Sequence, residues 1–157
     1  MTHSPVKRSK TILVVDDIPL MRTILSKYLK SLGLKILTED GVGCGVEVIE
    51  AANGKLALEY LKKRPVDMIF LDLMMPEMDG LTFLACKRED PQMNAIPVIV
   101  CSALGQKETV DRAQELGASS YIVKPFTVKS VEEKFREALC TLEGQGSASQ
   151  PLPGLPK

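Results

Sequence analysis

Five side chains that could carry out chemistry follow apolar runs of the sequence. They are Asp16 and Asp17 after "TILVV", Asp72 after "MIFL", Ser102 at the end of "PVIVCS" and Lys124 after "SYIV". Apolar runs of this kind are typical of strands buried on both faces of a parallel sheet. Because ligands bind beyond the carboxyl ends of such strands, we expect these side chains to meet at one edge of a sheet.

Three neighbouring carboxylates need a counter-charge. Two carboxylates about 4 Å apart repel by about 4 kcal/mol at an effective dielectric constant of about 20. Oxygen ligands alone favour a hard cation, and Mg²⁺ characteristically takes one or two carboxylates together with phosphate oxygens. The pocket is therefore predicted to hold Mg²⁺ and to receive a phosphoryl group. Asp72 would attack phosphorus to give an acyl phosphate, and Lys124 would neutralise the oxygens of the transition state.

Each of these side chains also has a purely structural interpretation. Asp17 could cap the helix that Pro19 opens. Asp72 and Ser102 could stabilise turns, and Lys124 could be a solvated surface lysine. The coincidence of these residue types at four strand ends favours the functional interpretation.

Strand-like and helix-like segments alternate along the chain. Strands are expected at 11–15, 46–51, 66–71, 97–102 and 120–123, and helices at 19–32, 55–64, 81–89, 107–117 and 127–142. Pro19 suits the first turn of the first helix, and Gly33 predicts its end. The alternation predicts a flavodoxin-like, doubly wound α/β fold with a five-stranded parallel sheet in the order 2-1-3-4-5 and five helices.

Composition narrows the class of protein. The chain has 157 residues, with 20 Lys and Arg against 20 Asp and Glu, so no overall charge attracts nucleic acid. No apolar run has the length of a membrane helix, and the N-terminus lacks a signal-peptide segment. The four cysteines show no metal-knuckle or redox spacing. We expect a cytoplasmic protein without membrane insertion, a monomer or weak dimer.

The remaining segments set the expected domain boundaries. One domain is expected at 10–142, after a flexible N-terminus at 1–9 and before a disordered Gly/Ser/Pro-rich tail at 143–157. The connection 34–45 is unusually long and is expected to be an inserted loop or a β-hairpin around Asp40-Gly41. With no output domain in view, the chain is expected to act as a stand-alone module.

The segments "ILVVDD", "LDLMMPEMDG", "VIVCSA" and "YIVKPF", in this order, resemble the receiver domain of bacterial two-component response regulators, of the chemotaxis type. The resemblance implies that Asp72 accepts phosphate from a sensor histidine kinase or a histidine phosphotransfer protein. It also implies a switch of a protein-binding surface formed by 105–142, which a downstream protein target would read.

The resemblance assigns a role to each site residue. Asp17, Asp72 and the backbone carbonyl of Met74 would bind Mg²⁺, with Asp16 acting through water. Ser102 would bond the phosphoryl group, Tyr121 would be the rotating aromatic of the switch, and Lys124–Pro125 would be a cis peptide. Met74 and Leu104 would overhang the approach of water to the phosphoryl group, which predicts slow hydrolysis.

Two alternatives share parts of this chemistry. A haloacid-dehalogenase-type phosphatase also uses an Asp nucleophile with Mg²⁺, but it needs a second acid at the position where this chain has Met74. A phosphorelay intermediate would pass the phosphate on to a histidine phosphotransfer protein. A nucleotide-binding module is disfavoured, because "GVGCGV" at 41–46 lacks the third glycine and precedes a strand.

Overall fold

The computed structural model describes residues 9–37 and 45–144. This part of the chain contains five strands and six helices. The strands are β1 (Lys10–Val15), β2 (Val46–Ala51), β3 (Met68–Leu71), β4 (Val98–Ser102) and β5 (Ser120–Val123). The helices are α1 (Pro19–Leu37), α2 (Gly54–Lys63), α3 (Gly80–Glu89), α4 (Pro91–Asn94), α5 (Lys107–Glu115) and α6 (Val128–Gly144).

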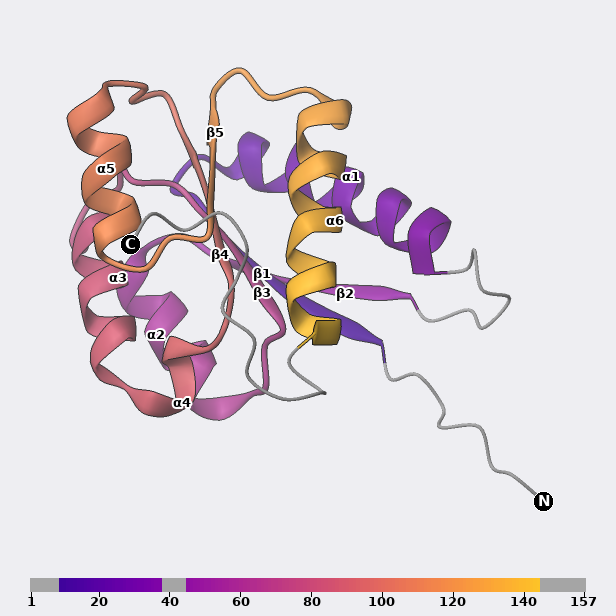
Figure 1. The fold of residues 1–157 in the computed structure, drawn as a ribbon, viewed down its shortest axis with the longest axis horizontal. Helices are drawn as coiled ribbons and strands as arrows, with labels where there is room; N and C mark the ends of the chain where they lie inside the picture. Colours follow the sequence, from indigo (N-terminus) through magenta and orange to yellow (C-terminus); the bar gives the residue numbers. More distant parts are fainter. Residues whose placement is uncertain (1–8, 38–44, 145–157) are drawn as a thin grey trace.

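The strands form one parallel sheet in the order β2-β1-β3-β4-β5, which confirms the predicted topology. Helices α1 and α6 cover one face of the sheet, and α2, α3 and α5 cover the other (Figure 1). This three-layer arrangement buries the central strands on both sides, which explains the continuous apolar runs in β1, β3 and β4.

Each face of the sheet has its own hydrophobic core, because successive side chains of a strand point to opposite faces. In β1, Ile12 and Val14 pack towards α1 and α6, whereas Leu13 and Val15 pack towards α2 and α3. Phe70 of β3 and Phe83 of α3 are fully buried on opposite sides of the sheet. The two cores hold the carboxyl ends of the strands in fixed relative positions.

The first helix does not end at Gly33, so that prediction was wrong. Helix α1 continues to Leu37, and Gly33 lies inside it at its crossing with β2. A Cβ atom built on Gly33 would lie 2.1 Å from Cγ2 of Val46, so this position needs glycine for close packing rather than for a stop. Residues 34–37 are therefore helical and not part of a loop or hairpin. Residues 38–44 lie outside the described part of the chain.

The described residues also contain a sixth helix where five were expected. The short helix α4 begins with Pro91 in its first turn, and the Asp90 side chain accepts a hydrogen bond from the Gln92 backbone N–H at 2.9 Å. This Asp-Pro pair is an ordinary start signal for a helix. At the other end of the domain, α6 continues to Gly144, so 143 and 144 are helical rather than part of a tail. The predicted flexible ends at 1–8 and 145–157 lie outside the described residues.

None of the helices in the described ranges combines the length and the hydrophobicity that crossing a membrane requires.

Candidate functional site

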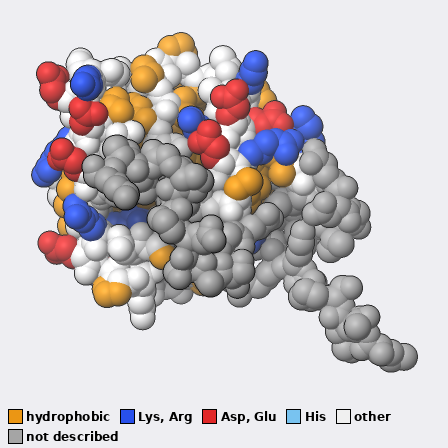
Figure 2. Space-filling model, in the orientation of Figure 1, with side chains coloured by type: hydrophobic (Ala, Val, Ile, Leu, Met, Phe, Trp, Pro, Cys, Tyr) orange, Lys and Arg blue, Asp and Glu red, His pale blue; other side chains and the backbone are white. Residues whose placement is uncertain are grey.

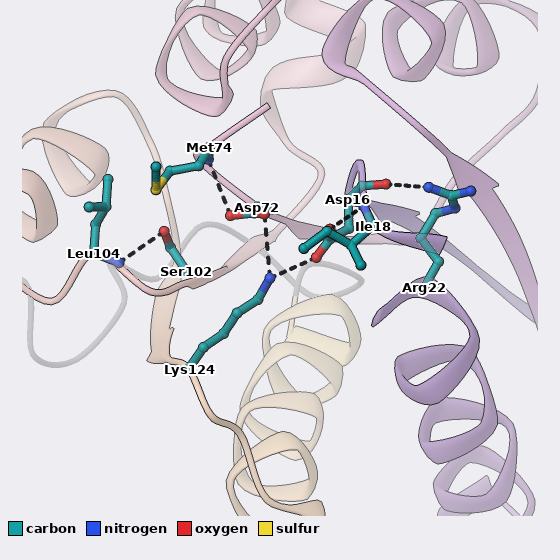
Figure 3. Close-up of polar contacts among 8 residues, drawn as sticks. All are labelled: Asp16, Ile18, Arg22, Asp72, Met74, Ser102, Leu104 and Lys124. Carbon is teal, nitrogen blue, oxygen red and sulfur yellow. Dashed lines mark hydrogen bonds and ion pairs between the residues drawn. The ribbon is translucent and has the colours of Figure 1, made fainter. Parts of the chain in front are cut away.

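The loops that follow β1, β3, β4 and β5 lie side by side at the carboxyl edge of the sheet (Figure 3). Backbone hydrogen bonds continue across this edge beyond the strands. The Asp16 N–H donates to the Ala51 carbonyl at 3.1 Å, and the Asp72 N–H donates to the Val15 carbonyl at 2.9 Å. The Lys124 N–H donates to the Ser102 carbonyl at 2.8 Å. The side chains of the site therefore start from backbone positions that the sheet itself holds.

Lys124 bridges two of the three carboxylates. Its Nζ atom lies 2.8 Å from Oδ2 of Asp16 and 3.4 Å from Oδ2 of Asp72. Asp16 and Asp72 are both only 5% exposed. The second oxygen of Asp16 accepts a hydrogen bond from the Ile18 N–H at 2.9 Å, and the second oxygen of Asp72 accepts one from the Met74 N–H at 3.2 Å. Both carboxylates are thus held in fixed orientations.

Burial and charge act in opposite directions on these groups. Burial raises the pKa of the Asp72 carboxyl above its usual value, although the Lys124 charge and the Met74 N–H act to lower it. For Lys124, burial alone would lower the pKa of the ammonium group. The hydrogen bond to Asp16 and the charges of Asp72 and Asp16 outweigh burial and raise this pKa instead. Lys124 therefore stays charged at neutral pH.

The third carboxylate completes an acidic cluster. One carboxylate oxygen from each of Asp16, Asp17 and Asp72 lies within 4.8 Å of the others. The Asp17 carboxylate forms no hydrogen bond or ion pair with any residue that the structure describes. One ammonium group facing three carboxylates leaves an excess of negative charge, and every ligand atom is an oxygen. This donor set fits a hard divalent cation.

Ser102 and Tyr121 both contact the loop between β4 and α5. Ser102 is fully buried, and its Oγ accepts a hydrogen bond from the Leu104 N–H at 3.2 Å. The Tyr121 hydroxyl donates to the Leu104 carbonyl. Ser102 lies across from Asp72 in the close-up view (Figure 3). The Lys124–Pro125 peptide bond is cis, as the resemblance implied.

An apolar hollow of about 480 Å³ adjoins the acidic cluster. Met74, Met75 and Leu104 line it together with Asp17. Met74 is 56% exposed. A molecule approaching Asp72 from this side meets thioether and aliphatic groups, and the carboxylates of Asp17 and Asp79 are the only hydrogen-bonding side chains among the described residues that line the hollow.

The comparison with known protein families agrees with this arrangement. The model of the response regulator receiver domain matches residues 12–136, which is most of the chain. The chain belongs to the response regulator receiver family. Receivers are phosphate-accepting signalling domains rather than classical enzymes, and the acidic cluster of this receiver suits that activity.

This receiver is similar to curated chemotaxis proteins and to the solved structure of a putative response regulator. It is 37% identical over 129 residues to the chemotaxis protein CheY of Bacillus subtilis (strain 168), covering 82% of this chain and 96% of that protein. It is 33% identical to the chemotaxis protein CheY-3 of Vibrio cholerae, covering 82% of this chain and 91% of that protein. A putative response regulator from Chloroflexus aurantiacus J-10-fl superimposes with a TM-score of 0.73 at 26% identity, covering 84% of this chain and 98% of that one.

Two residues that support the receiver site were not predicted from the sequence. Arg22, in the first turns of α1, donates from Nη1 to the Asp16 carbonyl at 2.7 Å. Gly80 begins α3, and a Cβ atom there would lie 2.5 Å from the Asp72 carbonyl oxygen. The "DG" pair before the third helix was a usable signal for Gly80. For Arg22 the only signal was its place near a helix start, from which a long side chain reaches back past the N-terminus.

Proposed function

We propose that this receiver accepts a phosphoryl group on Asp72 from a phosphohistidine donor, with Mg²⁺ bound in the acidic cluster. The observation that carries the proposal is the convergence of the Asp16, Asp17 and Asp72 carboxylates within 4.8 Å, with Lys124 bridging two of them. Asp17, Asp72 and the Met74 carbonyl would hold the cation, and Asp16 would act through a water molecule. When bound, Mg²⁺ supplies positive charge beside the phosphoryl oxygens.

The transfer itself needs little covalent chemistry from the protein. An oxygen of the Asp72 carboxylate forms a bond to phosphorus while the phosphorus–nitrogen bond of the donor breaks, and the electron pair returns to the donor imidazole. Lys124 moves from its carboxylate partners to a phosphoryl oxygen and neutralises the charge there. The Ser102 hydroxyl donates a hydrogen bond to another phosphoryl oxygen. The Met74 N–H, at 3.2 Å from Asp72, keeps the nucleophile in place.

The switch follows from the contacts of the β4–α5 loop. The Ser102 hydroxyl can donate to a phosphoryl oxygen while its Oγ still accepts from the Leu104 N–H, so a movement of Ser102 towards the phosphoryl group would pull the β4–α5 loop with it. Because Tyr121 is bonded to the carbonyl of the same residue, a shift of this loop releases Tyr121 as well. The two states would present different surfaces over 105–142 to a downstream protein.

A histidine kinase is the partner that the family implies, and a histidine phosphotransfer protein would serve equally as donor. In the view of Figure 2, acidic and basic side chains of the described residues are interspersed. The chain carries 20 Lys and Arg against 20 Asp and Glu, and this lack of net positive charge supports a protein target rather than nucleic acid. We place the activity in the cytoplasm, where such phosphohistidine donors act.

The proposal is tested by intact mass after incubation with Mg²⁺ and acetyl phosphate. The protein should gain one phosphoryl group, and Asp72→Asn should gain none. Asp79→Asn is the matched control, because Asp79 lies in the same loop but caps α3 through the Thr82 N–H at 2.8 Å and lies outside the acidic cluster. An adduct that persists in Asp72→Asn refutes Asp72 as acceptor. Steady release of inorganic phosphate from small phosphate esters would indicate a phosphatase instead.

A further inference from the structure

Arg22 links the edge strand β2 to the backbone of the acidic loop. Its Nη1 donates to the Asp16 carbonyl at 2.7 Å, and its Nε lies 3.5 Å from Oε1 of Glu50 near the end of β2. The Arg22 side chain is only 17% exposed. Figure 3 shows it extending from α1 towards the Asp16 carbonyl, on the side of Asp16 away from Lys124. The guanidinium group is therefore held at Nη1 by the Asp16 carbonyl and at Nε by the Glu50 carboxylate.

The Asp16 carbonyl belongs to the peptide group that joins Asp16 to Asp17. That group is planar, so fixing its carbonyl also fixes the direction in which the chain enters Asp17. Asp16 has further anchors in Ala51, Ile18 and Lys124. The Asp17 carboxylate has no partner among the described residues, so its direction depends only on the backbone at Asp17 and on its own rotamer.

We propose that Arg22 is a positioning residue for cation binding, holding the 16–17 peptide so that the Asp17 carboxylate faces Asp72. Glu50 orients the guanidinium for this task. The inference rests on the proposed cation site, and it adds a contact that does not touch the cation. A charged hydrogen bond to a carbonyl restrains the peptide more strongly than a neutral one would.

Whether replacing Arg22 weakens or tightens Mg²⁺ binding distinguishes a positioning role from a purely electrostatic one. A positive charge beside three carboxylates weakens cation binding, so removing the Arg22 charge should by itself tighten binding. Loss of positioning acts in the opposite direction. Replacing groups that orient the ligands of a metal typically weakens affinity by about 10–100-fold. We expect the positioning effect to prevail, with about tenfold weaker binding of Mg²⁺.

The test is calorimetric titration of the full chain with Mg²⁺, for the unmodified protein, Arg22→Met, Asp17→Asn and Arg64→Met. Arg64 is the matched control because it pairs at 2.7 Å with Glu47, which lies on β2 like Glu50, and because neither Arg64 nor Glu47 belongs to the acidic cluster. Arg22→Met should bind about tenfold more weakly and Arg64→Met like the unmodified protein. In the cation-free proteins, the ¹³C carbonyl resonance of Asp16 should move upfield in Arg22→Met and stay unchanged in Arg64→Met. Thermal melting reports whether each variant is folded, and Arg22→Gln replaces Arg22→Met if the latter unfolds.

The outcomes distinguish this inference from the proposed function. Equal or tighter Mg²⁺ binding by the Arg22 variant, beside an unmodified protein that binds Mg²⁺, overturns the positioning role and leaves the cation site intact. An unmodified protein that does not bind Mg²⁺, or an Asp17→Asn variant that binds it equally well, overturns the cation site and the inference with it.

Discussion

Lys87 is a buried lysine whose charge should cost this receiver stability at neutral pH. It lies on α3, is 3% exposed, and donates from Nζ to the Asn94 carbonyl at 3.2 Å. Burial lowers the pKa of its ammonium group from 10.5 to about 8. A difference of this size corresponds to a free-energy penalty of about 3 kcal/mol when the lysine is charged in the folded state.

Replacing Lys87 by methionine removes this penalty and keeps most of the buried volume. The lost hydrogen bond to Asn94 costs about 1 kcal/mol, so Lys87→Met should be about 2 kcal/mol more stable than the unmodified protein at pH 7. The pKa of Lys87 is lower in the folded than in the unfolded chain, so the unfolded chain binds more protons between about pH 8 and 10.5. The penalty is therefore complete below pH 8 and disappears as the pH rises. The advantage of Lys87→Met should shrink by about 1.4 kcal/mol per pH unit in this range.

Urea unfolding at pH 7 and at higher pH measures both quantities. Comparing variant with unmodified protein at each pH cancels the titration of other groups that the two share. Lys62→Met is the control, because Lys62 is exposed on α2 and its replacement should change stability little at any pH. A stability difference for Lys87→Met that stays constant with pH, or a variant less stable at pH 7, would refute the reasoning.

Three further predictions concern packing, phosphate lifetime and the switch. Gly33→Ala should lower the free energy of unfolding by about 1–2 kcal/mol, because overpacking against Val46 outweighs the gain in helix propensity. Adding Val46→Ala should recover this loss in urea unfolding, and a double variant whose stability is the sum of the two single effects would contradict the contact. Met74→Asn or Leu104→Glu should speed loss of phosphate from the purified phosphoprotein about tenfold by orienting water, whereas unchanged decay rates would exclude this shielding. Tyr121→Ala should make binding of the downstream target less dependent on phosphate, and equal dependence, measured by titration with and without phosphorylation, would rule out the tyrosine as part of the switch.

Much of the fold and of the site is determined by local sequence. The apolar runs that end in Asp16, Asp72, Ser102 and Lys124 predicted strands, and strand ends of a parallel sheet converge whatever the details of packing. The residue types at these ends then defined an oxygen-rich pocket with one ammonium group, as the structure has it. Such inferences succeed because they need only the period of hydrophobicity and the topology.

Tertiary packing decided the features that depend on contacts between distant segments. Gly33 is a stop signal in isolation, yet α1 continues through it, and the glycine is needed because β2 approaches so closely that no side chain fits between them. Lys87 occupies a buried place that no local pattern marks. Arg22 has an ordinary helical position, and only the folded chain brings its guanidinium to the Asp16 carbonyl and to Glu50. The sequence pattern records which residues are apolar, whereas the distance between two segments follows from the packing of the whole core.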